Sequence, residues 1–191
     1  MQLRDRIRHW LSDLELRPLT SEYKREAAVL MPIFERDGEP YFLLTRRSEE
    51  LRIHKGQISF PGGSRDNEEN LQDTALRETF EELGLSPSKI EILGQFHEYM
   101  SSTEYRVVPY AGYLEEPFIT TPEPCEVAEV LQVPFSVFLE PKNFRVEQVV
   151  RLGRSMDVYF YSYGNCTIWG LTARIIKDFL DELRMSGIRD G

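Results

Sequence analysis

Residues 63–85 read GSRDNEENLQDTALRETFEELGL. Residues 66–82 within this stretch contain seven acidic side chains and a single basic one, that of Arg77. The spacing of the apolar residues predicts a helix over residues 71–83. Gly84 suits the left-handed conformation with which many helices end. The stretch therefore predicts a short, capped helix whose excess of acid needs a chemical explanation.

A helical wheel divides the side chains of this predicted helix into two groups. The first is an apolar stripe made of Leu76, Phe80 and Leu83. The second consists of three acids that share the opposite face: Glu78, Glu81 and Glu82. Glu78 and Glu82 are four residues apart with no Lys or Arg at a compensating helical position, and like charges so placed repel each other. A divalent cation between them would remove the repulsion, and Mg²⁺ and Mn²⁺ prefer oxygen ligands. The alternative interpretation is a solvated acidic face on a surface helix.

The residues just before the helix favour the metal interpretation. Residues 60–63 read FPGG, and paired glycines allow main-chain amides and carbonyls to approach a metal or a phosphate closely. A loop of this kind leading into an acidic helix is suited to hold a metal and a diphosphate.

The spacing of Gly63, Glu69 and residues 77–85 resembles the Nudix box, G-x5-E-x7-R-E-U-x-E-E-x-G-U, where U is aliphatic. Eight of its nine specified positions match, and the departure is Thr79 at the first U position. Thr79 borders the apolar stripe on the wheel, so we expect a local change in packing and an intact acidic face.

A second pattern lies upstream of the box. Residues 43–63 resemble L-L-T-x-R-S-x3-R-x3-G-x3-F-P-G-G, the signature of Nudix coenzyme A pyrophosphatases, at every specified position. Residues 168–173, IWGLTA, are also similar to a segment of that family. The resemblance covers about residues 28–180.

The resemblance implies a role for each matching residue. Glu78 and Glu82 would be the main ligands of Mg²⁺ or Mn²⁺, and Glu81 a further ligand that takes part in catalysis. Gly62 or Gly63 would offer a carbonyl oxygen to the metal. Glu69 and Arg77 would form a supporting ion pair, for which a surface pair of little consequence is the alternative. A general base outside the helix is common in the superfamily. The candidates, each of which could instead be a solvated carboxylate, are Glu98, Glu104, Glu126 and Glu129, and Glu126 is favoured.

A basic cluster precedes the acidic helix: Arg46, Arg47, Arg52 and Lys55. Arginine is suited to bidentate phosphate contacts, whereas the alternative role is to balance the neighbouring acids. The signature favours Arg47 and Arg52, together with Gly62 and Gly63, as substrate-binding residues. Coenzyme A carries a 3′-phosphate that a dedicated arginine could bind. Weaker candidates for substrate contacts, for which a structural role is the alternative, are His54, Tyr99, Tyr105, Phe118 and Trp169.

The activity implied by the resemblance is metal-dependent hydrolysis of coenzyme A or acyl-CoA to 3′,5′-ADP and 4′-phosphopantetheine or its acylated form. Two alternatives stay open. One is a Nudix diphosphatase for another nucleoside diphosphate derivative, such as ADP-ribose or a dinucleotide. The other is a non-catalytic Nudix domain that binds a nucleotide as a regulator, which the intact acids at positions 78, 81 and 82 disfavour.

Composition sets limits on the partners. The chain has 191 residues and a formal net charge of −9, which disfavours a nucleic-acid or membrane-surface binder. No apolar run suits a signal peptide or a membrane span, so a cytoplasmic setting is expected. Two cysteines and three scattered histidines show no metal-ligand spacing. The expected partner is a small nucleotide, and a homodimer is left open.

The rest of the chain predicts an α/β (α+β) domain, and the resemblance specifies it as a Nudix fold, an α/β/α sandwich around a mixed sheet. Residues 1–20 would form an amphipathic N-terminal helix, and residues 21–191 a single Nudix hydrolase domain. A hairpin is predicted from residues 27–34 and 41–45 around an Asp-Gly turn, with Pro32 indicating an edge strand or a bulge. Further strands are predicted over residues 90–97, 106–113, 127–133, 144–150 and 158–163, and a last helix over residues 171–184.

Overall fold

The computed structural model of the chain describes residues 2–49, 55–151 and 154–187. Its helices are α1 (Leu3–Asp13), α2 (Leu71–Leu83), α3 (Phe135–Leu139) and α4 (Gly170–Met185), with short 3-10 turns at Pro87–Lys89 and Pro141–Asn143. The first six strands are β1 (Arg25–Arg36), β2 (Glu39–Arg47), β3 (Ile58–Ser59), β4 (Gly62–Ser64), β5 (Ile90–Gln95) and β6 (Tyr99–Met100). The others are β7 (Tyr105–Leu114), β8 (Val127–Pro134), β9 (Phe144–Arg151), β10 (Arg154–Tyr163) and β11 (Cys166–Trp169). The predicted helices and strands are confirmed, except that the N-terminal helix predicted over residues 1–20 ends at Asp13, and residues 14–20 form neither helix nor strand. Helix α3 and the short strands β3, β4, β6 and β11 had no clear signal in the sequence.

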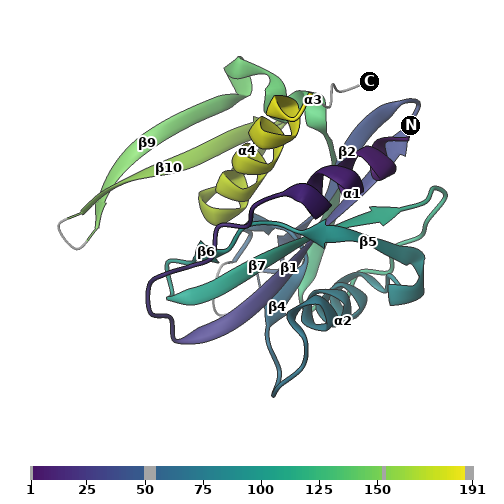
Figure 1. Ribbon diagram of the computed structural model, residues 1–191, viewed down its shortest axis with the longest axis horizontal. Coiled ribbons are helices and arrows are strands. Elements are labelled where there is room, and N and C mark those ends of the chain that lie inside the picture. Colours follow the sequence, from purple (N-terminus) through teal and green to yellow (C-terminus); the bar gives the residue numbers. More distant parts are fainter. Residues whose placement is uncertain (1, 50–54, 152–153, 188–191) are drawn as a thin grey trace.

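The main sheet is mixed. Its central order is β3-β2-β1-β7-β5, and β4, β6 and β8 pair with β1, β7 and β2 respectively. Strands β1 and β7 are parallel, whereas the other pairs are antiparallel. A second, antiparallel sheet has the order β11-β10-β9, and the β9–β10 ribbon extends away from the body (Figure 1).

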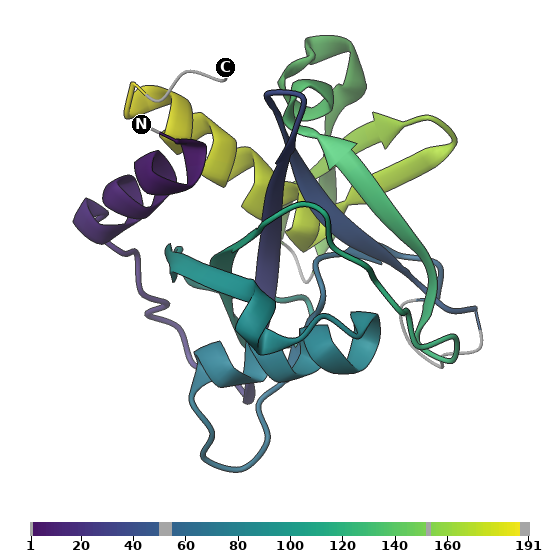
Figure 2. The ribbon, with the colours of Figure 1, turned by 90° about the vertical axis from the view of Figure 1, so that its right-hand side faces the viewer.

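Helices cover both faces of the main sheet, as the predicted sandwich requires. Side chains alternate along β1, so Leu30 and Phe34 pack beneath α2 whereas Met31 and Ile33 face the opposite core. That opposite core also holds the apolar residues of α1 and α4, and the two views show α2 on one side of the sheet and α1 and α4 on the other (Figures 1 and 2). The α/β/α arrangement is therefore confirmed.

The N-terminal helix buries the stripe that its periodicity predicts. Leu3, Ile7 and Leu11 are buried, and the ring of Trp10 meets that of Phe179 edge-on at 5.2 Å between centroids. Helix α1 therefore shares its core with α4. Among the described residues, no helix is long and apolar enough to cross a membrane.

Pro32 does not mark an edge strand, because β1 is central in the sheet. Its pairing with β4 ends at Val29, and its pairing with β2 begins at Ile33. Between these points the N–H of Leu30 donates to the carbonyl of Pro61. Backbone groups alternate along a strand, so the nitrogen of Pro32 points to this same side, between the two pairings. The proline therefore removes no ladder hydrogen bond, and the expectation of an edge position was wrong.

Candidate functional site

The glycine pair of residues 62–63 forms β4 and lies against both β1 and α2. Gly62 has φ of 153°, and a Cβ atom there would lie 2.3 Å from the carbonyl oxygen of Ala28. A Cβ atom on Gly63 would lie 2.4 Å from the carboxyl carbon of Glu78. Only glycine therefore lets β4 pair with β1 while the acidic helix packs on its other side.

Helix α2 begins and ends as its sequence predicts, but its buried face is different. The side chain of Asn70 accepts a hydrogen bond from the N–H of Gln72, and Gly84 adopts the left-handed conformation at φ 67°. Phe80, expected in the apolar stripe, is 52% exposed, whereas Glu82, expected on the solvent side, is only 3% exposed. The predicted stripe is therefore wrong at Phe80.

The buried face of α2 is centred on small side chains. Ala75 and Thr79 are fully buried and lie between the helix and the sheet. The hydroxyl of Thr79 donates to the carbonyl of Ala75 at 2.7 Å, so its polar atom is satisfied. The departure from the Nudix box at Thr79 is thus absorbed locally, as expected.

Glu82 is a buried carboxylate with an unsatisfied oxygen. Burial raises its pKa to about 8, and the charges of Glu78 and Glu126 act in the same direction, whereas Arg47 and the Gly62 amide oppose them. The nearest guanidinium nitrogen of Arg47 lies 3.9 Å from its Oε1, and no hydrogen-bond partner among the described residues reaches its Oε2. This oxygen is therefore available to bind a ligand.

Arg77 gathers the other acids around one guanidinium group. It donates to Glu69 at 2.8 Å, to Glu78 at 2.9 Å and to Glu81 at 3.1 Å. Its hydrogen bond lowers the pKa of Glu69 to about 2, whereas burial raises the pKa of Glu78 despite the same arginine. The expected ion pair of Glu69 and Arg77 is confirmed, and it ties the loop to α2. The sequence predicted that no basic residue compensates Glu78 and Glu82. This was wrong, because Arg77 binds Glu78 and Arg47 lies beside Glu82.

The basic cluster does not act as one group. Arg46 donates to Glu129 at 2.8 Å and contacts the Sγ of Cys166. Arg47 instead faces Glu82, and within the part of the chain that the structure describes its buried Nε has no hydrogen-bond partner. Lys55 is exposed, and Arg52 and His54 lie outside the described residues. Of the two predicted substrate-binding arginines, the structure therefore places Arg47 beside the acidic helix.

The candidate bases are separated in space. Glu98 is bound by Arg106, Glu104 pairs with Lys24, and Glu129 pairs with Arg46. The charge of Glu126 raises the pKa of both Glu78 and Glu82, so Glu126 lies near these two acids. Among these four acids, Glu126 is the one placed at the site.

Glu126 reaches the site through a loop whose role the sequence did not indicate. The N–H of Thr121 donates to the carbonyl of Leu83 at 2.7 Å, and that of Glu123 donates to the carbonyl of Glu82 at 3.0 Å. These bonds satisfy carbonyls at the end of α2 that would otherwise be unpaired. The loop therefore caps α2 and carries Glu126 toward its acids.

The aromatic candidates mostly have structural contacts. Tyr99 donates to Asp178 at 3.1 Å, and Phe118 meets the ring of Phe34 edge-on. Trp169 remains 42% exposed and stacks on Phe160. Stacking on a substrate stays a prediction for these rings.

The donor set fits a hard divalent cation in chemical type. Glu82 offers an unsatisfied oxygen, and Glu78 lies beside the main chain of Gly63. Within the described ranges, no three His, Cys, Asp or Glu side chains are already grouped to hold a metal. Glu81 is half exposed and bound to Arg77, so it would have to turn to join the others. The assignment of Glu78, Glu81 and Glu82 as ligands stays a prediction.

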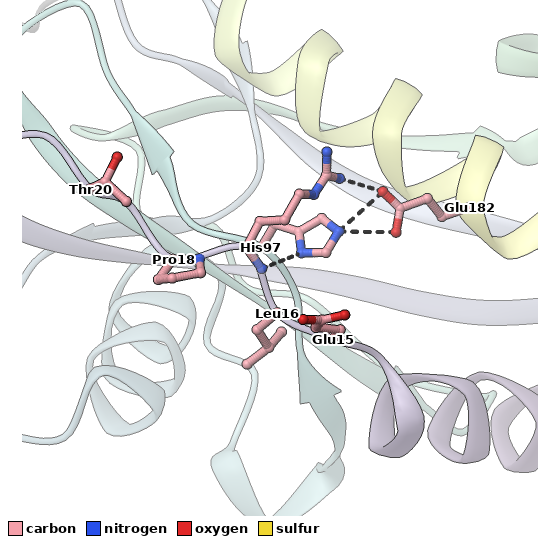
Figure 3. Close-up of a pocket in the computed structure, with 7 residues that line it drawn as sticks. Glu15, Leu16, Pro18, Thr20, His97 and Glu182 are labelled. Atoms are coloured by element: carbon pink, nitrogen blue, oxygen red, sulfur yellow. Dashed lines mark hydrogen bonds and ion pairs between the residues drawn. The ribbon is translucent and has the colours of Figure 1, made fainter.

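A separate cavity of about 510 Å³ lies between residues 15–20 and α4 (Figure 3). His97 projects into it with Glu182, and the Nδ1 of the ring accepts a hydrogen bond from the N–H of Arg17. Nε2 lies 3.0 Å from Glu182, which also pairs with the guanidinium of Arg17. These groups satisfy one another and hold the segment that follows α1, so this cavity has a structural explanation.

Comparison with known proteins identifies related sequences. A sequence model of the NUDIX domain matches residues 24–152. The chain is 40% identical over 166 residues to the uncharacterized Nudix hydrolase NudL of Photorhabdus laumondii, covering 86% of this chain and 88% of that protein. It is also 40% identical over 162 residues to the chloroplastic Nudix hydrolase 22 of Arabidopsis thaliana, covering 80% of this chain and 53% of that protein.

A solved structure shares the fold. The MutT/nudix family protein of Enterococcus faecalis superposes with a TM-score of 0.54 at 17% identity, covering 97% of this chain and 70% of that one. At this identity the likeness concerns the fold alone.

Proposed function

The chain belongs to the Nudix hydrolase family, which acts on phosphoanhydride bonds, and from that premise we propose that it cleaves the diphosphate of coenzyme A or acyl-CoA. The products would be 3′,5′-ADP and 4′-phosphopantetheine or its acylated form. The reaction is hydrolysis, in which water attacks phosphorus and the bridging oxygen leaves with one of the two halves.

The observation that supports this proposal is the meeting of two sequence patterns at one site. The upstream signature contributes Arg47, the Nudix box contributes Glu78 and Glu82, and Gly63 belongs to both patterns. Arg47 lies beside Glu82, and Gly63 lies against Glu78. Arg47, from the pattern that resembles the coenzyme A subfamily, thus lies beside an acid of the Nudix box, which supports the proposal.

Each residue has a role in this proposal. Glu78 and Glu82, with Glu81 as a further ligand, would hold Mg²⁺ or Mn²⁺, aided by a carbonyl of Gly62 or Gly63. The bound cation would neutralise phosphate oxygens and lower the pKa of the attacking water. Glu126 would accept the proton of that water, and Arg47 would hold a phosphate oxygen.

A substrate panel tests the proposal. The full chain is incubated with Mg²⁺ or Mn²⁺ and, separately, coenzyme A, acetyl-CoA, dephospho-CoA and ADP-ribose, and the products are identified by mass spectrometry. We expect kcat/KM for coenzyme A to exceed that for ADP-ribose by at least about tenfold, with loss of turnover in EDTA. Preference for ADP-ribose would reassign the chain to another Nudix substrate class. Binding without turnover of any substrate would indicate the non-catalytic alternative.

A further inference from the structure

A cavity of about 200 Å³ lies next to the glycine pair, on the side of the main sheet that α4 covers. Its apolar walls are Val29 of β1, Val107 of β7, and Leu171 and Ile175 of α4. Gly63 also lines it. Gly63 also lies against the carboxyl group of Glu78. The backbone of Gly63 therefore lies between this cavity and the acidic helix.

The chemistry of this cavity differs from that of the rest of the site. None of the described residues that line it is charged, and its polar side chains are the hydroxyls of Ser59 and Thr172. The basic group assigned to phosphate binding, Arg47, lies instead beside Glu82 on α2. A phosphate or a sugar with several hydroxyls would lose hydrogen bonds to water in such a cavity without replacing them. The cavity therefore suits a neutral and mostly apolar group.

The size of the cavity limits this group further. A volume of about 200 Å³ has room for several water-sized groups, so it suits a small segment of a substrate and not a whole nucleotide. With the diphosphate bound at the glycine pair, as the proposed function has it, the group in this cavity would be attached directly to the diphosphate. A compact, branched segment fits these conditions better than a long chain or a ring system.

We propose that this cavity binds the pantoyl segment of the substrate, the carbon with two methyl groups and the adjacent carbinol that follow the 4′-phosphate of pantetheine. The inference rests on the proposed function and deepens it, because it names the part of coenzyme A that confers selectivity. The methyl groups would contact Val29, Leu171 and Ile175, and the hydroxyl of Ser59 or Thr172 would bind the carbinol. ADP-ribose places a ribose at this point, and its hydroxyls would remain unpaired.

The test measures binding of the two product halves separately by titration calorimetry in Mg²⁺. Leu171→Asn places an amide in the half-exposed wall of the cavity. We expect it to weaken binding of 4′-phosphopantetheine about tenfold, while binding of 3′,5′-ADP stays within about twofold of the wild-type value. Leu139→Asn, at an equally half-buried leucine of α3, is the matched control and should change neither affinity.

A second variant tests the inference independently, in case the first does not fold. Thr172→Phe fills the cavity from the first turn of α4, and thermal unfolding shows whether each variant is folded. We expect it also to weaken binding of 4′-phosphopantetheine selectively. Equal weakening of both product halves in either folded variant, or no binding of 4′-phosphopantetheine to the wild type, would overturn the inference.

These outcomes are distinct from failure of the proposed function. If the wild type binds 4′-phosphopantetheine through Leu171 but does not hydrolyse coenzyme A, the cavity assignment stands and the proposed reaction falls. If coenzyme A is hydrolysed and Leu171→Asn affects both halves alike, the reaction stands and the cavity assignment falls.

Discussion

Gly62 and Gly63 are adjacent in sequence, but a side chain at each position would contact a different part of the structure. A methyl group on Gly63 would meet the flexible end of the Glu78 side chain, whereas one on Gly62 would meet the backbone of Ala28 and Val29. A carboxylate can rotate away, but paired strands cannot separate without losing their hydrogen bonds. A side chain at position 63 would therefore displace a movable side chain, whereas one at position 62 would disturb the paired strands.

We predict that Gly63→Ala folds normally but loses at least about tenfold in kcat, because Glu78 is displaced from the site. Gly62→Ala should lower the free energy of unfolding by about 2 kcal/mol or more, since its φ of 153° is also strained for a residue with a Cβ atom. Chemical denaturation and steady-state kinetics of both variants separate the two effects. A Gly63→Ala protein with wild-type kcat would remove Glu78 from the mechanism.

Glu82 combines deep burial with an unsatisfied oxygen, a costly arrangement for stability alone. We predict that Glu82→Gln lowers metal-dependent turnover about 100-fold or more, equivalent to about 3 kcal/mol in the barrier. Above about pH 8, where Glu82 is ionised, its thermal stability should be equal or higher, because a neutral amide costs less to bury than a carboxylate. Glu68→Gln, an exposed acid of the preceding loop, is the control and should leave both quantities unchanged. Wild-type turnover in Glu82→Gln would exclude Glu82 as a metal ligand.

Helix α2 is held from three directions. Arg77 joins it to the loop through Glu69, the small face of Ala75 and Thr79 packs on the sheet, and residues 121–126 cap its end. This close packing on small side chains brings Glu82 into the interior, where its charge can serve a ligand.

The segment between α1 and β1 is attached to the rest of the protein mainly through His97 and Glu98. His97 accepts from the N–H of Arg17, and Glu98 donates its own N–H to the carbonyl of Arg17 at 3.1 Å. Because Nδ1 of His97 accepts, Nε2 carries the proton that it donates to Glu182. The ring thus connects the segment to α4.

We predict that His97→Ala lowers the free energy of unfolding by about 1–3 kcal/mol, because it leaves buried groups without partners. Limited proteolysis should then cut residues 14–24 faster, whereas kcat should stay unchanged because the ring is hydrogen-bonded to Arg17 and Glu182, which the proposed reaction does not use. The control is His9→Ala, an exposed residue of α1 that should change neither measurement. Unaltered stability and proteolysis in His97→Ala would show that the attachment does not depend on the ring.

At the scale of the whole molecule, an ion-pair network connects neighbouring strands and loops of the main sheet. Arg106 of β7 binds both Glu98 and Glu26, and Glu26 also binds Arg65 beyond β4. The hydrogen bond from Arg106 lowers the pKa of Glu98 below its ordinary value of 4.5. Stability from this carboxylate is therefore complete above about pH 4.5 and is lost as the pH falls through its lower folded-state pKa.

We predict that Glu98→Gln lowers the free energy of unfolding at pH 7 by about 1–3 kcal/mol, since a buried charged hydrogen bond is lost. The difference from wild type should shrink as the pH falls from about 5 to 3, where the wild-type carboxylate becomes protonated. Urea denaturation at several pH values measures this slope. Glu104→Gln, which breaks an exposed pair with Lys24, should cost less than about 1 kcal/mol at any pH. A pH-independent difference for Glu98→Gln would mean that the charge is not responsible.

The sequence by itself determined the features that depend on neighbours along the chain. The ends of α2, the Asp37-Gly38 hairpin turn and the family follow from local spacing, since caps, turns and motifs are read within a few residues. The stripe of α1 was also predictable, because one side of that helix is continuously apolar.

Tertiary structure decided which side chains are buried and which acids meet. The burial of Glu82 and exposure of Phe80 follow from the close approach of α2 to β4, and Glu126 and Arg47 arrive from segments distant in sequence. The cavity beside Gly63 likewise needs α4, more than 100 residues farther along the chain. Such contacts depend on the packing of whole layers, and periodicity within one segment carries no information about the partner that will cover it.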